Sequence, residues 1–150
     1  MKPRIGNLYK RQSSYKWYYI YDVQINGNRY YKRLHQIIAM YAIGQLYGTE
    51  TDTHHLNGIT IDNRPSNLAV VPNRRLHNKI DLYTKMQKLT GIPVTVRIDG
   101  IVYVGDIIRD DNFDVNVAIA WWLRQVANED YPDESNDTET VARRRKRLGL

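Results

Sequence analysis

Residues 51–80 read TDTHHLNGITIDNRPSNLAVVPNRRLHNKI, and this stretch decides what fold the 150-residue chain is expected to take. The Asn-Gly pair at 57–58 and the Asp-Asn pair at 62–63 are typical of turns. The apolar run 68–71 suits a short strand, and the Pro-Asn step after it can start a helix over residues 72–89. Three of the four histidines lie in this stretch, so turn, strand and helix signals surround a cluster of imidazoles.

The segment before this stretch predicts a β-hairpin followed by a helix. Residues 16–31, KWYYIYDVQINGNRYY, are rich in aromatic and β-branched side chains around Asn26-Gly27, a pair that accepts the positive φ angles of a tight hairpin turn. Residues 34–44, LHQIIAMYAIG, place most of their apolar side chains on one side of a 3.6-residue wheel. This spacing indicates a short amphipathic helix that ends at Gly44.

The segment after it predicts a second hairpin and a further helix. In residues 94–106, VTVRIDGIVYVGD, the pair Asp99-Gly100 lies between two runs rich in valine and isoleucine. Asp114 is a candidate N-cap for a helix over VNVAIAWWLRQVAN. Trp121-Trp122 are expected to pack in the core or to mediate self-association rather than to stack on bases, because the residues before them are acidic.

Composition places the chain among small globular proteins. With 42% hydrophobic and 25% charged residues it can bury one modest core, which excludes a multidomain assembly at this length. The chain has no cysteine, which excludes disulfide frameworks, thiolate zinc sites and cysteine nucleophiles. No apolar run reaches the length of a signal peptide or a membrane span, so we expect a soluble intracellular protein with no membrane partner.

Charge is distributed unevenly along the chain. The formal net charge is +6 and the pI is about 9.5, which favours an anionic partner such as nucleic acid. Residues 1–90 carry fourteen Lys or Arg against five Asp or Glu, whereas residues 91–130 carry three against seven. The anion-facing surface is therefore expected in the N-terminal part. Residues 131–150 are expected to form a disordered tail, whose basic cluster 143–147 is either a DNA-tethering arm or a solubilising element.

The histidine cluster suits the hydrolysis of a phosphodiester. That reaction needs a base to activate water and a cation to stabilise the developing charge and the leaving oxygen. His55 can supply the base, because a neutral imidazole with an ordinary pKa near 6.5 accepts a proton at physiological pH. His35, outside the stretch, is expected to be an ordinary polar residue of the surface or core.

These residues resemble the HNH endonuclease family. HHLNGITIDNRPSNL, the following AVV and a helix carrying His77 are similar to its ββα-metal motif. RLHQIIAMY resembles the helix upstream of that motif in phage and homing members, so the likeness covers about residues 30–80. It implies a metal-dependent DNA endonuclease of phage or homing type, acting in the cytoplasm of a bacterial or phage-infected cell.

The resemblance, set beside the element pattern, predicts an α+β fold. A ββα-metal (HNH) core, preceded by an N-terminal β-hairpin and helix, makes up a domain at residues 1–90. A small β-hairpin plus helix forms an appendage at residues 91–130, and a flexible basic tail covers residues 131–150.

Carried over by position, the resemblance assigns four site residues. His55 is the general base, and Asn67 fixes the intervening loop and orients that base. His54 is a metal ligand from the first strand, and His77 is the metal ligand on the helix.

The metal site admits alternatives. Asn73 or Asn78 could take the place of His77 as the helix ligand. One divalent ion is expected, Mg²⁺ or Mn²⁺, with Ni²⁺ and Zn²⁺ as further candidates because imidazole ligands favour softer ions.

DNA is the expected partner, and cationic side chains around the motif and in the N-terminal hairpin are expected to contact its phosphates. The candidates are Arg64, Arg74, Arg75, Lys79, Arg29, Lys32 and Arg33.

Two other functions stay open at this point. One is a catalytically silent DNA-binding protein on an HNH scaffold, and the hairpin and helix bear a faint likeness to AP2-type DNA readers. The other is a protein-interaction factor that uses the acidic C-terminal segment and the Trp helix. Metal-independent DNA binding without cleavage would favour the first, and salt-insensitive association without DNA would favour the second.

Overall fold

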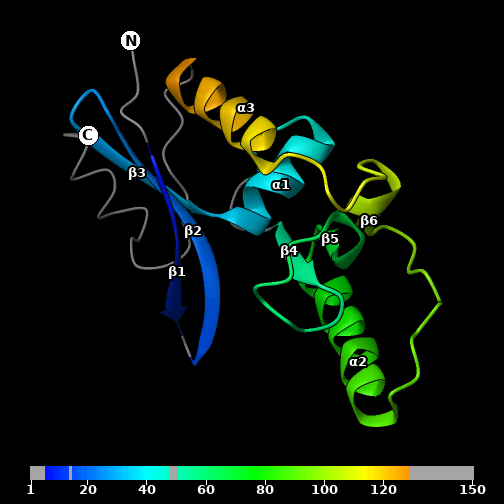
Figure 1. The fold of residues 1–150 in the computed structure, drawn as a ribbon. Helices are drawn as coiled ribbons and strands as arrows, with labels where there is room; N and C mark the ends of the chain where they lie inside the picture. Colours follow the sequence, from blue (N-terminus) through cyan, green and yellow to red (C-terminus); the bar gives the residue numbers. More distant parts are fainter. Residues whose placement is uncertain (1–5, 14, 48–50, 129–150) are drawn as a thin grey trace.

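The computed structural model describes residues 6–13, 15–47 and 51–128. This part of the chain is a mixed α+β fold with two small antiparallel sheets and three helices (Figure 1). The expected α+β class is confirmed, and the predicted tail at 131–150 lies outside the described residues. None of the described helices combines the length and the apolar character that a membrane span requires.

The first sheet contains β1 (Asn7–Ser13), β2 (Lys16–Ile25) and β3 (Asn28–Arg33), hydrogen-bonded in that order. β2 and β3 form the predicted hairpin, and its two turn residues have positive φ angles, 52° at Asn26 and 80° at Gly27. These angles match a tight turn whose twist fits the strands on either side. β1 was not predicted, because its sequence NLYKRQS is mostly polar and gives little hydrophobic alternation.

Helix α1 (Leu34–Ile43) begins directly after β3 and ends at Gly44, which has a left-handed φ of 77°. The sequence predicts an amphipathic helix, but every side chain from Leu34 to Met40 is buried. The reason is that α1 lies in the middle of the fold, in contact with the first sheet, the second sheet and α3 (Figure 1). Its polar residues His35 and Gln36 are therefore core residues.

The second sheet consists of β4 (Asp52–His55), β5 (Leu68–Val71) and β6 (Val102–Tyr103), in that order. A 3₁₀ turn, Pro65–Asn67, leads into β5. Helix α2 (Arg74–Thr90) follows β5 and completes a ββα unit, as the sequence predicts.

β5 joins two hydrophobic cores because its side chains alternate between the two faces of the sheet. Leu68 and Val70 belong to the larger core, which contains α1 and α3. Ala69 and Val71 belong to a smaller core with residues of α2. β5 thus packs against α2 on one face and against α1 and α3 on the other.

The second predicted hairpin is wrong. Residues 92–98 form no strand, and β6 pairs with β5 instead. β5 pairs with β4 along one edge, and β6 takes the backbone hydrogen bonds along its other edge. The turn at Asp99-Gly100 is present, and the N–H of Ile101 donates to the Ile98 carbonyl across it at 3.3 Å. Ile98 is buried in the smaller core, and its own N–H donates to the Tyr103 hydroxyl at 3.0 Å.

Helix α3 (Val115–Asn128) confirms the predicted C-terminal helix. The Asp114 carboxylate accepts a hydrogen bond from the N–H of Asn116 at 3.0 Å, as a capping residue does. Trp122 is completely buried and packs edge-on against Tyr21, with ring centroids 6.2 Å apart. Trp122 is therefore a core residue.

Candidate active site

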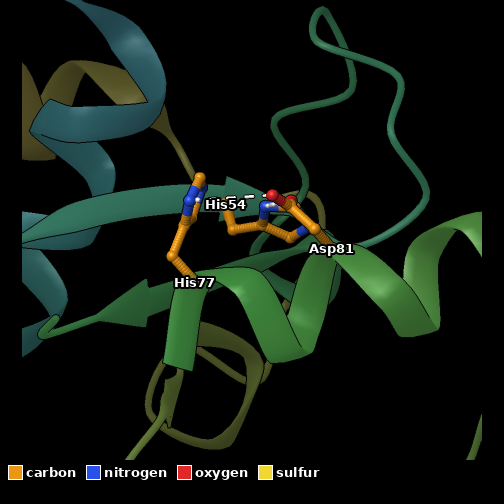
Figure 2. A group of neighbouring side chains, drawn as sticks. All are labelled: His54, His77 and Asp81. Carbon is orange, nitrogen blue, oxygen red and sulfur yellow. Dashed lines mark ion pairs between the residues drawn. The ribbon is translucent and has the colours of Figure 1, made fainter. Parts of the chain in front are cut away.

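The ββα unit brings the motif histidines together. His54 and His55 are the last two residues of β4 and pair with Ala69 and Leu68 of β5. Their side chains point to opposite faces of the strand, so that His54 faces α2 and His55 faces α1. Figure 2 shows His54 reaching across to α2.

The start of α2 is fixed by Asn73. Its side-chain oxygen accepts a hydrogen bond from the N–H of Leu76 at 3.0 Å, so this asparagine caps the helix. The cap places His77 in the second turn, where its ring lies 5.7 Å from that of His54. The structure thus gives Asn73 a role in the helix cap, whereas His77 faces the other histidine.

A carboxylate that was not predicted joins the two histidines. Asp81 lies one helical turn after His77, and its two oxygens are 3.5 Å from Nδ1 of His54 and 3.7 Å from Nδ1 of His77 (Figure 2). One potential ligand atom from each of the three residues lies within 4.8 Å of the others. The i to i+4 spacing of His77 and Asp81 is the sequence signal that could have found this residue.

The charge state of His54 suits a metal ligand. Its side chain is only 12% exposed, and burial lowers its pKa to about 4 against the smaller opposing effect of Asp81. At neutral pH the imidazole therefore carries no charge and cannot form an ion pair with the carboxylate. Imidazole nitrogens and a carboxylate are donors that divalent transition metals accept, so the side chains of His54, His77 and Asp81 fit such an ion.

His55 is buried on the other side of β4, with 5% of its surface exposed. Its Nε2 lies 2.8 Å from Oδ1 of Asn63, and its ring packs edge-on against His35 at 4.6 Å. Burial lowers the pKa of His55 below 6.5, although the hydrogen bond to Asn63 works in the opposite direction. An unprotonated imidazole at neutral pH is what a general base needs.

Asn67 ties together the loop that follows β4. Its side chain accepts from the N–H of Asn57 at 2.9 Å and donates to Oδ1 of Asn57 at 2.9 Å and to the Asp62 carbonyl at 2.8 Å. It makes no hydrogen bond to His55. Asn63, within the loop, makes that contact, although the sequence had suggested only a turn residue there.

A cleft of about 300 Å³ contains the site. Its lining includes His54, His55, His77 and Asp81 of the ββα unit. The first sheet contributes Lys16, Tyr18 and Arg33 to the same lining. The guanidinium of Arg33 lies over the Tyr18 ring at 3.9 Å, which holds the cation flat in the wall of the cleft.

A larger cavity of about 400 Å³ lies between α2 and the segment 94–98. Its lining is mainly apolar and includes none of the predicted catalytic or metal-binding residues. We therefore place the candidate active site in the smaller cleft.

The predicted DNA-contacting cations fall in different environments. Arg33 lines the cleft, whereas Arg29 and Arg64 are exposed but bonded to Asp22 and Asp62 respectively. Lys32 is 2% exposed, so its side chain does not lie on an open surface. The remaining three, all exposed on α2 outside the cleft lining, are Arg74, Arg75 and Lys79.

Comparison with known proteins agrees with this geometry. A sequence model of the HNH endonuclease family matches residues 32–78, which run from the end of β3 to the first turns of α2. Residues 32–78 are thus similar to the HNH endonuclease family, and this similarity supports a nuclease-type enzyme with DNA as substrate. No curated protein and no solved structure matches the chain.

Proposed function

We propose that this protein is a metal-dependent HNH endonuclease, of the phage or homing type, that hydrolyses DNA phosphodiester bonds. The observation that carries the proposal is the single cleft shared by three metal-binding side chains and a neutral, oriented histidine. His54, His77 and Asp81 would hold one divalent ion, Mg²⁺ or Mn²⁺, with Ni²⁺ and Zn²⁺ as further candidates.

His55 is the proposed general base. Oδ1 of Asn63 can only accept a hydrogen bond, so Nε2 of His55 carries the ring proton and Nδ1 keeps its lone pair. That lone pair takes a proton from water as the water oxygen bonds to phosphorus and the bond from phosphorus to the 3′ oxygen breaks. A bound divalent ion supplies positive charge for the phosphate and the leaving oxygen.

The rest of the loop keeps this base in place. Asn67 joins Asn57 to the Asp62 carbonyl, and the Asp62 carboxylate accepts hydrogen bonds from Asn57 and Arg64 at 2.8 Å each. We assign Asn67 to loop closure, through which it positions Asn63 and hence His55. A base held in this way spends no energy on reorientation during the reaction.

The substrate strand is proposed to lie between the metal ligands and the first sheet. Lys16 and Arg33 give the lining of the cleft positive charge, which suits a phosphodiester backbone. The exposed cations Arg74, Arg75 and Lys79 on α2, together with Arg29 and Arg64, would extend this contact to neighbouring phosphates.

The test is the conversion of supercoiled plasmid to open-circular and linear DNA in Mg²⁺, Mn²⁺, Ni²⁺ or EDTA. The proposal predicts conversion with a divalent ion, none in EDTA, and loss of conversion in His77→Ala. Conversion that persists in EDTA would refute the metal-dependent mechanism. Metal-independent DNA binding with no cleavage under any condition would instead favour a silent DNA-binding protein on this scaffold.

A further inference from the structure

Thr84 connects the proposed metal site to the backbone of the loop after β4. It lies on α2 three residues after Asp81, so the two side chains share one face of the helix. Its side chain is buried, with 8% exposed, and its hydroxyl oxygen is 2.9 Å from Nε2 of His54 and 3.1 Å from the Leu56 carbonyl oxygen.

The hydrogen count at Thr84 fixes the direction of both bonds. A carbonyl oxygen can only accept, so the single hydroxyl proton of Thr84 goes to Leu56. The hydroxyl oxygen must then accept from the N–H at Nε2 of His54. A neutral imidazole carries one ring proton, so Nδ1 of His54 is left with a lone pair, and this atom faces Asp81 at 3.5 Å.

We propose that Thr84 is a positioning residue that holds His54 in the Nε2–H tautomer and thereby makes Nδ1 its metal-binding atom. The inference rests on the metal site of the proposed function. It adds Thr84 as the residue that determines which nitrogen of His54 binds the metal and how the His54 ring is rotated. Hydrogen bonds to the outer nitrogen of a ligating histidine fix the ring and increase its basicity in the same way.

The loop is packed to keep this contact. Gly58 has a φ of 74° and closes a turn in which its N–H donates to the His55 carbonyl at 2.9 Å. A Cβ at this position would lie 3.3 Å from Cγ2 of Thr84 and 2.4 Å from Cε of Lys88. The backbone of the loop therefore lies directly against α2, which holds the Leu56 carbonyl within reach of Thr84.

The second histidine lacks an equivalent contact. Nε2 of His77 lies 3.6 Å from Asp52, beyond hydrogen-bond distance, and the side chain is 30% exposed. Of the two proposed ligand histidines, His54 is thus the one whose Nε2 is held at hydrogen-bond distance by another side chain of the described residues. We therefore expect the metal affinity to depend on Thr84 more than on Asp52.

The first test measures Mn²⁺ affinity by calorimetry in Thr84→Val and Thr84→Ser. The valine variant keeps the shape but removes the hydroxyl, and we expect its affinity to fall by about 10–100-fold. The serine variant keeps the hydroxyl and should bind within a few-fold of the wild type. Thr90→Val is the matched control, because its hydroxyl lies on the same helix but bonds to the Met86 carbonyl, and it should leave the affinity unchanged.

The second test uses ¹⁵N NMR of the His54 ring in the metal-free protein, assigned with His54→Gln. A protonated and a bare ring nitrogen have widely separated shifts, so the tautomer is observed directly. We expect protonated Nε2 in the wild type and in Thr84→Ser.

The outcomes separate the two proposals. A wild-type protein with the Nε2–H tautomer that binds no Mn²⁺ contradicts the proposed metal site but not the role of Thr84 in orienting the ring. Protonation at Nδ1 in the wild type, or wild-type Mn²⁺ affinity in a folded Thr84→Val, would overturn the inference. If Thr84→Val does not fold, the tautomer of His54 in the wild type, observed by NMR, decides whether the proposed role of Thr84 stands.

Discussion

The Oδ1 atom of Asn63 lies 2.8 Å from Nε2 of His55, so a residue of the loop orients the ring that is proposed to activate water. Asn63→Ala removes this acceptor and lets the ring rotate and exchange tautomers. We expect kcat for plasmid cleavage to fall by about 10–100-fold with little change in KM, because a misplaced base impairs the chemical step rather than binding. Asn116→Ala, an exposed asparagine on α3, is the control; equal losses in both variants would contradict a specific role for Asn63.

Asp81 is expected to be a third metal ligand. Asp81→Asn keeps the size of the side chain but removes the charge that faces both histidines. The variant should lose the rise in melting temperature that Mn²⁺ gives the wild type, since a bound ion stabilises the folded state in proportion to its affinity. Asp99→Asn, an exposed residue of the turn at 99–100, should keep the full rise. An unchanged shift in Asp81→Asn would remove this residue from the site.

Substitution of Arg33 tests whether the first sheet contributes to the candidate active site. Arg33 lines the same cleft as the proposed metal ligands, and Arg33→Ala is expected to lower kcat/KM by about 10–100-fold, because a charge-assisted contact to the phosphate is lost. Arg33→Lys should recover little, since an ammonium cannot make the same bidentate contact. Lys10→Ala, an exposed cation of the same sheet outside the cleft lining, should behave like the wild type. Similar losses in Arg33→Ala and Lys10→Ala would point to general attraction for DNA instead.

His35 should make the folded protein sensitive to acid. It is fully buried, and burial, followed by the nearby His55 and two cationic neighbours, holds its pKa well below 6.5. The unfolded chain therefore binds a proton that the folded protein rejects, and stability is lost as the pH falls below 6.5. The slope is at most about 1.4 kcal/mol per pH unit.

Urea unfolding near pH 7.5 and near pH 5 measures this effect. His35→Gln keeps a polar side chain but does not titrate, so its stability should fall less than that of the wild type between the two conditions. His54 and His55 are present in both proteins, so the difference reports on His35 and its interaction with His55. The same pH dependence in both proteins would mean that His35 is protonated as easily in the folded chain as in the unfolded one.

The sequence predicts the elements that local signals specify. Asn26-Gly27 and Gly44 have the left-handed angles expected of a hairpin turn and a helix end, and Asn73 caps the helix that carries His77. The α+β class follows from these elements. The prediction of the second hairpin fails because valine and isoleucine at 94–106 show only that the segment is apolar, not which strand it pairs with.

The residues of the candidate site also form two groups, those that the sequence reveals and those that it does not. His54, His55 and His77 could be found because their spacing along the chain resembles a known motif. Asn63 and Thr84 could not, because their partners are set by packing: a loop folded back on β4 in one case, and α2 lying against that loop in the other. Side chains that orient a site are selected by three-dimensional contact, which one sequence does not display.

The most direct test of the proposed mechanism compares the wild type with His55→Ala for Mn²⁺ affinity and for plasmid cleavage in the same buffer. His55 is not one of the three proposed metal ligands, so we expect the variant to bind Mn²⁺ as the wild type does but to cleave at least about 100-fold more slowly. Cleavage by a folded His55→Ala at the wild-type rate would contradict the proposed mechanism.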